Sequence, residues 1–462
     1  MDYTSITPQQ RQEMLEVIGI SSVEDLFAVI PDACRLDRPL DLEPARSELE
    51  LQRELTRLSE ANIGPHNRAC FMGGGSYDHF IPAFIDQVIS RGEYLTAYTP
   101  YQGEASQGSL QAFFEFQTQV ARLTGLDIAN ASLYEGASAT AEAILLALNA
   151  TGKRRVLVAS TLHPDYLQVV RTVCEGLPCD VVMLPATGGR VDAATVAEMA
   201  DDDTAAAVIP SPNIYGLIED WKGCFAALKG ASTVGNPPCA IAVFHPIACG
   251  LLAKPGECGA DIAAGEGQPL GVPMSLGGPY LGLLSARSTL MRKMPGRLVG
   301  QTSDTEGRRA FCLSLQTREQ HIKRSKATSN VCTNQGLLAL RATMYMSAMG
   351  PNGLREVAEQ CWHKAHHLAS RISALPGFSL PFKGPFFNEF VIRCPRPARD
   401  YIRAGKPVGL LAGIALDSPR LARLGDERDL LIAVTEKRSR RELDMFVDFL
   451  SVMPTEATKE SA

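Results

Sequence analysis

The chain has 462 residues, of which 45% are hydrophobic and 21% charged, and its formal net charge is −6 at pH 7. This length is several times that of a common domain, so we expect one large domain with smaller additions. The acidic balance argues against a nucleic-acid partner, which would favour a basic surface. No run of residues approaches the ~18–20 apolar residues that cross a bilayer, and no secretory signal is visible. We therefore expect no membrane contact and a cytoplasmic location.

The cysteines and histidines give no clear sign of a metal site. The twelve cysteines are scattered singly from Cys34 to Cys394, with no C-x-x-C pair, so we predict buried, reduced thiols rather than disulfides. His363, His366 and His367 follow one another on a predicted helix and could face a metal ion. No cysteine or carboxylate completes such a site, and we expect this chain to hold no metal.

Residues 1–65 are predicted to form an N-terminal helical arm. Pro8 is placed to open a first helix, and Ser22 is placed to cap a second one over residues 23–30. Leucines at helical spacing follow, at Leu49, Leu51, Leu55 and Leu58. We interpret the segment as an arm that wraps a partner chain; a surface helical hairpin is the alternative.

A glycine run and a polar loop come next. Gly73, Gly74 and Gly75 would let the backbone approach another group closely. Residues 98–108 (the Tyr98 loop) are pinned by Pro100 and precede an amphipathic helix that starts near Ser106 or Ser109 and buries aromatic side chains. Loops of this kind often carry function, although a polar surface turn is the alternative. The candidate catalytic residues in the loop are Tyr98, Tyr101, Gln102, Glu104, Ser106 and Gln107.

From residue 130 to residue 286 strands and helices alternate, which predicts a mostly parallel sheet with helices on both faces. We assign residues 66–330 to a large α/β domain. Residues 331–462 are assigned to a long connecting helix and a small C-terminal α+β domain. The strands expected in the large domain are 156–159, 180–183, 206–209, 240–244, 261–264 and 280–285, and those of the small domain are 387–392 and 430–434.

Residues at the ends of these strands could form a cofactor pocket. A helix that starts at Gly136, Ala137 and Ser138 presents free N–H groups, which suit a phosphate, although Ser138 could simply cap that helix. His163 follows one strand and could stack on an aromatic ring, or it could be an ordinary loop histidine. His245 directly follows another strand.

Two motifs mark a resemblance to a known family. They are YTPYQ-x-E-x-SQG-x-LQ followed by FE-x-QT, and RxQHI-x-R-x-KATSN. The chain resembles the N-terminal (alpha) subunit of the two-subunit form of the glycine cleavage system P-protein family. The resemblance implies an architecture like that of fold type I pyridoxal-phosphate enzymes. It also implies glycine decarboxylation, with transfer of the aminomethyl group to the lipoyl arm of H-protein. The implied partners are a beta subunit, in a heterotetramer of two alpha and two beta chains, H-protein and glycine.

Pyridoxal enzymes need a lysine that holds the cofactor aldehyde as a Schiff base and a carboxylate beside the pyridine nitrogen. By resemblance, the catalytic subunit carries a His-Lys pair where this chain has Gln268 and Pro269, and His245 stands where an aspartate is expected. Pro269 cannot form a Schiff base. We therefore expect pyridoxal phosphate to be bound by the beta subunit. The pocket of this chain is expected to be vestigial, with Gly136, Ala137, Ser138, His163, His245, Gln268 and Pro269 as its residues.

Two alternatives remain open. Lys326 or Lys254 could be a true Schiff-base lysine, which would make the chain a self-sufficient pyridoxal enzyme such as an aminotransferase or desulfurase. Residues 308–321 are predicted to contain no strand, however, so Lys326 would not follow the sheet, and Lys254 lies beside Pro255 in a loop. The second alternative is a non-catalytic pseudo-enzyme that only stabilises its partner.

Overall fold

The computed structural model describes residues 5–36, 38–231, 235–331, 333–421 and 424–453. The chain divides into two compact units, Met1–Ile63 and Gly64–Ala462. None of the helices within those ranges is long and apolar enough to cross a membrane.

The first unit is helical and has almost no core. Its elements are α1 (Pro8–Ile18), the 3₁₀ helices η1 (Val23–Phe27) and η2 (Asp32–Cys34), and α2 (Glu48–Ala61). Thr7, Ser22 and Ser47 each start a helix with a capping box. Ser22 is therefore the predicted cap, but the segment that it opens ends at Phe27 rather than at residue 30.

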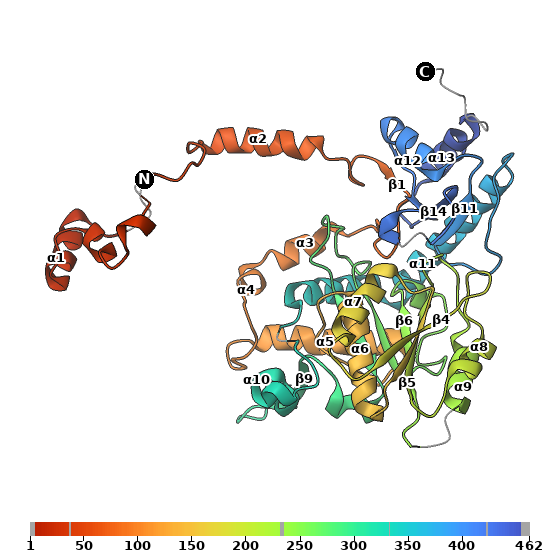
Figure 1. The fold of residues 1–462 in the computed structure, drawn as a ribbon, viewed down its shortest axis with the longest axis horizontal. Coiled ribbons are helices and arrows are strands. Elements are labelled where there is room, and N and C mark those ends of the chain that lie inside the picture. The colour runs from red at the N-terminus through yellow and green to blue at the C-terminus, as the bar shows by residue number, and fades with distance from the viewer. Residues whose placement is uncertain (1–4, 37, 232–234, 332, 422–423, 454–462) are drawn as a thin grey trace. The chain divides into compact units, whose positions relative to one another are not determined.

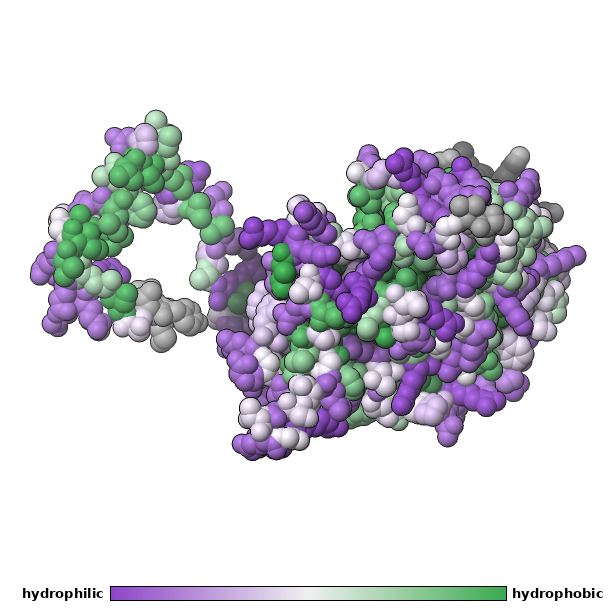
Figure 2. Space-filling model, turned by 90° about the horizontal axis from the view of Figure 1, so that it is seen from below, coloured by the Kyte–Doolittle hydropathy of each residue, from purple (hydrophilic) through white to green (hydrophobic). Residues whose placement is uncertain are grey.

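Nearly all apolar side chains of this unit are exposed. Leu15 is the one side chain that is buried among the unit's described residues, and Figure 2 shows runs of hydrophobic atoms on the part of the chain before Gly64. Short helices depend on packing of an apolar face for their stability. This unit lacks such packing within itself.

The second unit is built on a seven-stranded sheet with the order β2-β8-β7-β6-β5-β3-β4 (Figure 1). The five strands from β7 to β4 run parallel, while β8 pairs antiparallel with both β7 and β2. The predicted mostly parallel sheet is confirmed. Its strands are β2 (Ile128–Ala129), β3 (Arg155–Ala159), β4 (Asp180–Leu184), β5 (Thr204–Ser211), β6 (Cys239–Phe244), β7 (Ile262–Glu266) and β8 (Gly282–Ala286).

Alternate strand residues point to opposite sides of the sheet. Both faces carry buried apolar side chains, and helices cover both. On one face α6 (Gly136–Thr151) and α7 (Pro164–Cys174) pack on Val156, Val158 and Val208. On the other, a second apolar cluster joins Leu157 and Ile209 to several helices. They include α5 (Gln107–Thr124), α8 (Ala193–Met199), α9 (Trp221–Ala231) and α11 (Gly336–Ser373, with a break at Gly350).

A hairpin corrects one expectation. Residues 308–321 were predicted to contain no strand, and this prediction is wrong: β10 (Arg309–Ser314) pairs antiparallel with β9 (Leu298–Ser303). Charged residues occupy the turn, where the Arg308 side chain donates to Asp304 at 2.8 Å. The inward residue Phe311 packs on Phe114 of α5, with ring centroids 5.3 Å apart. The charged turn therefore hid a strand that packs on α5.

The remaining elements complete the second unit. A three-stranded sheet has the order β11-β14-β13, and β1 pairs in parallel with β12. The strands are β1 (Ala69–Cys70), β11 (Glu389–Arg393), β12 (Leu410–Leu411), β13 (Ile414–Ala415) and β14 (Asp429–Ala433). The helices are α3 (Ala83–Ile89), α4 (Gly92–Leu95), η3 (Ala248–Gly250), η4 (Ser288–Lys293), η5 (Gln316–Arg318), α10 (Gln320–Lys323), η6 (Arg324–Lys326), α12 (Ala398–Gly405), η7 (Lys406–Val408), η8 (Pro419–Leu421) and α13 (Arg440–Val452).

One buried carboxyl group on α6 predicts a pH-dependent stability. Glu142 is 8% exposed, and burial raises its pKa from 4.5 to about 7, although a hydrogen bond from Ser329 opposes the rise. The group is neutral in the folded chain at pH 5 and charged at pH 8. The free energy of unfolding is therefore higher at low pH and falls as the pH rises through about 7.

Replacement of Glu142 by glutamine is expected to raise the melting temperature at pH 8 and to leave it nearly unchanged at pH 5. Glutamine imitates the neutral acid, so at pH 8 it avoids a cost of at most about 3 kcal/mol, at about 1.4 kcal/mol per pKa unit. Thermal unfolding at both pH values measures the effect. Glu198→Gln, at an exposed position of α8, is the matched control and should change neither value. Equal melting curves of the two variants at pH 8 would contradict the prediction.

Candidate functional site

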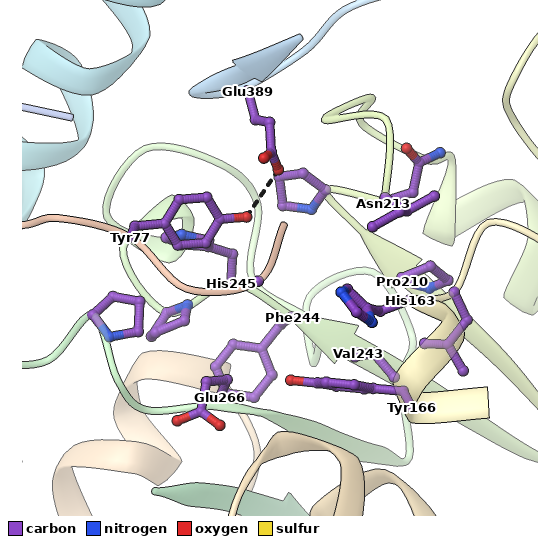
Figure 3. A pocket seen from close by; sticks show the side chains of 16 residues that line it. Tyr77, His163, Tyr166, Pro210, Asn213, Val243, Phe244, His245, Glu266 and Glu389 are labelled. Atoms are coloured by element: carbon purple, nitrogen blue, oxygen red, sulfur yellow. Dashed lines mark hydrogen bonds between the residues drawn. The ribbon is translucent and has the colours of Figure 1, made fainter. Parts of the chain in front are cut away.

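The carboxyl ends of the parallel strands meet at a cavity of about 80 Å³, which we call the strand-end cavity (Figure 3). Such edges are the usual ligand sites of α/β sheets. Three residues predicted for the vestigial pocket line the cavity together: His163 at the start of α7, His245 after β6 and Pro269 after β7. The sequence prediction did not include several other lining side chains: Tyr77, Tyr166, Asn213, Glu266 and Glu389.

The N-terminus of α6 is already occupied by carboxylates of the chain itself. Glu135 is the N-cap residue and accepts hydrogen bonds from the backbone N–H groups of Ala137, at 2.7 Å, and Ser138, at 3.0 Å. Glu266 accepts from Gly136 N–H at 2.9 Å. The hydroxyl of Ser138 also donates to Glu135. A phosphate at this helix end would therefore meet two carboxylates in the place where free donors are needed.

Tyr166 closes the same end of the cavity. A Cβ atom at Gly136 would lie 2.0 Å from the Tyr166 hydroxyl oxygen, so the tyrosine packs directly on the glycine backbone. Burial raises the pKa of Tyr166 well above its usual value. Burial also raises the pKa of Glu266 to about 7, against the lowering effect of backbone N–H groups of Gly136, Leu281 and Gln268. Packing and hydrogen bonds thus fill this end of the cavity.

The glycine run approaches a buried carboxyl group, as its composition suggested. A Cβ atom at Gly73 would lie 2.2 Å from a carboxyl oxygen of Glu389. The N–H of Gly74 donates to that carboxyl at 2.7 Å, and the Tyr77 hydroxyl donates to it at 3.0 Å (Figure 3). Burial raises the pKa of Glu389 to about 7. Backbone and phenol therefore hold this group in a fixed position on the cavity wall.

Gln268 and Pro269, where the resemblance implies a His-Lys pair in the catalytic subunit, lie in the turn after β7. Gln268 is 2% exposed, and its side-chain amide donates to the carbonyl groups of Tyr77, at 3.0 Å, and Val272, at 2.8 Å. Its amide oxygen accepts from Tyr77 N–H at 2.9 Å. Gln268 therefore fastens Tyr77 to the turn after β7 and has no free polar group to offer a ligand.

His245 does not replace a carboxylate in its chemistry. Burial lowers the pKa of His245 to about 3, so the ring is neutral and cannot balance a positive pyridinium. Lys254 donates to the carbonyl of Arg122 at 3.0 Å, and Lys326 is exposed in η6. Neither lysine lines the strand-end cavity, whose lining residues include no lysine. The residues present thus do not fit pyridoxal phosphate.

Residues of the Tyr98 loop line a second cavity. Pro100 is buried and anchors the loop, whereas Tyr98 is 92% exposed. The buried Arg297 donates a hydrogen bond to the Tyr101 hydroxyl, and its guanidinium carbon lies 4.5 Å from the centroid of the Tyr101 ring. Arg297 also donates to Asn334 at 3.2 Å. Tyr98, Pro100, Arg297 and Asn334 are among the residues that line a cavity of about 120 Å³.

The other candidate residues of the loop divide into two groups. Gln107 binds the β9–β10 hairpin through both amide atoms: it donates to the Phe311 carbonyl at 2.9 Å and accepts from Phe311 N–H at 2.8 Å. Ser106 is the N-cap residue of α5, without a side-chain capping bond. Gln102 and Glu104 are exposed. Gln107 therefore fixes the loop on the hairpin, while Tyr98, Gln102 and Glu104 face outward.

The structure brings in site residues that the sequence did not suggest. Arg297 and Tyr101 are 196 positions apart, and Gly136 and Glu266 are 130 apart. Only Glu135 had a local signal, since it directly precedes a predicted helix start.

His366 of α11 stacks on Phe386, with ring centroids 3.9 Å apart, and its Nδ1 lies 2.8 Å from the Trp362 carbonyl. This nitrogen is therefore already engaged.

Comparison with known proteins relates nearly the whole chain to one family. The sequence model of the glycine cleavage system P-protein family matches residues 1–450. A protein of Thermomicrobium roseum named probable glycine dehydrogenase (decarboxylating) subunit 1 is 48% identical over 454 residues, which cover 97% of this chain and 99% of that protein. A protein of the same name from Chlorobium limicola is 48% identical over 456 residues, covering 98% of this chain and all of that protein (100%).

Solved structures are also similar to this chain. A crystal structure of glycine decarboxylase (P-protein) of the glycine cleavage system, in inhibitor-bound form, superposes with a TM-score of 0.88. It is 42% identical, and the match covers 98% of this chain and 99% of that one. A NifS-like protein with 14% identity and a TM-score of 0.62, covering 83% of this chain and 98% of that one, shares the fold alone. This chain has the expected fold type I α/β architecture and belongs to the glycine cleavage system P-protein family.

Proposed function

We propose that this chain is the alpha subunit of a two-chain glycine decarboxylase. The observation that carries the proposal is the end-to-end similarity to proteins named glycine dehydrogenase (decarboxylating) subunit 1. The enzyme removes the carboxyl group of glycine and passes the aminomethyl group to the lipoyl arm of H-protein. We place it in the cytoplasm as a heterotetramer of two alpha and two beta chains.

Within this enzyme, the beta subunit binds pyridoxal phosphate. Three features of this chain support that division: Pro269 in the lysine position, the neutral His245, and the α6 N-terminus capped by Glu135 and Glu266. The contribution of this chain is the Tyr98 loop. Its exposed phenol and amide groups stand on a rigid support and complete the partner's pocket, where they orient glycine.

The direct test is the exchange of the glycine carboxyl group with bicarbonate. We expect no exchange by this chain alone and full exchange when it is mixed with its partner and H-protein. Omission of this chain should reduce the activity of the partner to background. Exchange by the purified single chain in the presence of pyridoxal phosphate would overturn the proposal and favour a self-sufficient enzyme.

Restoring the lysine alone should not restore cofactor binding. We expect Pro269→Lys to form no covalent bond with pyridoxal phosphate, because Glu135, Glu266 and Tyr166 still fill the phosphate end. Borohydride reduction followed by peptide mass analysis measures the bond. The wild-type chain treated in parallel gives the background from its other lysines. A modified peptide specific to residue 269 would contradict this prediction.

A further inference from the structure

Three side chains that suit a metal ion meet where distant segments of the second unit cross. His79 follows the glycine run, Cys361 lies on α11, and Glu436 follows β14. The Nδ1 of His79, the Sγ of Cys361 and a carboxylate oxygen of Glu436 all lie within 4.8 Å of one another. The imidazole and carboxylate atoms are 2.7 Å apart, and the thiol lies 3.4 Å from the same oxygen.

The cluster is enclosed by protein. His79 is 5% exposed, Cys361 is fully buried, and the side chain of Glu436 is 12% exposed. The other Glu436 oxygen accepts from Phe80 N–H at 2.6 Å, and Lys364 donates to the Glu436 carbonyl at 2.5 Å. These contacts orient the carboxylate, as outer hydrogen bonds do around metal ligands. Imidazole, thiolate and carboxylate are the three ligand types of zinc sites in proteins.

One polar atom of the cluster lacks a partner. Nε2 of His79, the ring nitrogen that does not face Glu436, has no hydrogen-bond partner within the described residues. Buried polar atoms are almost always paired.

We propose that His79, Cys361 and Glu436 form a zinc site, with a water molecule as the fourth ligand. On binding, the Cys361 thiol gives its proton to solvent, and the imidazole of His79 carries its proton on Nε2 so that Nδ1 can bind the metal. Three metal–ligand bonds then replace the hydrogen bonds to the Glu436 oxygen. The oxidation states of sulfur and metal do not change. The ion joins the segment after Tyr77, helix α11 and the loop after β14, so it fixes the segment that carries the cavity wall.

The test uses the untagged full-length chain in complex with its partner. After treatment with a chelator, the complex is equilibrated with Zn²⁺ or Co²⁺ alone, and the bound metal is counted after gel filtration. We expect each wild-type chain to bind one equivalent of metal that the chelator-treated complex lacks. With Co²⁺ we also expect a thiolate-to-cobalt absorption band. Cys361→Ser should weaken binding at least about tenfold, the lower end of what the loss of even an outer partner costs.

Cys394→Ser is the matched control, because Cys394 is equally buried and belongs to no group of three converging metal ligands among the described residues. It should keep the equivalent and the cobalt band. Glu436→Gln provides a second variant if Cys361→Ser does not fold. Absence of the equivalent in the wild type, or equal binding by Cys361→Ser and Cys394→Ser, would overturn the proposal and leave a metal-free hydrogen-bonded cluster.

Discussion

Removal of residues 1–63 is expected to abolish co-purification with the partner subunit while residues 64–462 remain folded. The first unit has one buried side chain within its described residues, and α2 has none. Leu49, Leu51, Leu55 and Leu58 of α2 are all at least 46% exposed. Full burial of one such side chain contributes ~1.5–3 kcal/mol, so a few of them suffice to hold two chains together. Co-purification and the thermal unfolding of the truncated chain measure the two parts of this prediction.

A pair of single substitutions sharpens the test of the arm. Leu55→Glu lies on the arm, where the side chain is 63% exposed, and should weaken the association. Leu177→Glu lies on the second unit, where the side chain is 40% exposed, and should leave it unchanged. If the truncated chain still retains its partner at full yield, the arm contributes nothing to assembly and the surface hairpin is the better interpretation.

Tyr101→Phe and Gln102→Ala are expected to reduce glycine–bicarbonate exchange roughly 10²–10³-fold in complexes that remain assembled. Loss of one donor that acts in a transition state costs roughly 2.7–4 kcal/mol. The Tyr101 hydroxyl has a defined place because it accepts a hydrogen bond from the buried Arg297. A displacement of about 1 Å can cost about a hundredfold, so loss of this anchor also disturbs the loop.

Subunit association and exchange should be measured on the same preparations. Gln111→Ala is the control, because Gln111 lies on α5 next to the loop and its amide binds Glu115 on the same helix. It should leave both properties near the wild-type level. Normal exchange in Tyr101→Phe and Gln102→Ala, or loss only in step with loss of assembly, would assign the loop a structural role. A scaffolding pseudo-enzyme would then be the better description of the chain.

The backbone of the sheet and the place of its cavity could be predicted from sequence, because both follow from local patterns. Buried parallel strands appear as short apolar runs, and their carboxyl ends meet at one edge. This is why His163, His245 and Pro269, which lie in three separate loops, were expected together. The β9–β10 hairpin was missed because the charged residues of its turn dominate the local pattern, although Leu298, Val299 and Phe311 are buried.

What fills the cavity could not be predicted, because it depends on packing between distant segments. Nothing near Glu266 in sequence indicates that its carboxylate binds the N–H of Gly136. Tyr166 belongs to a helix whose apolar spacing predicts only ordinary packing. The partners of Gln268 lie as far as 191 positions away. Such contacts require the relative positions of strands and loops, which no local pattern contains.

The carboxylate cap on α6 has an evolutionary consequence. A descendant of this chain would regain a phosphate site only by losing Glu135 and Glu266 from the helix end, withdrawing Tyr166 from Gly136, and exchanging Pro269 for lysine. Each change by itself leaves the cofactor unbound, and loss of either carboxylate leaves N–H donors of α6 without their acceptors. Selection therefore has no graded route back, and the proposed division of labour between the two chains rests on several independent contacts.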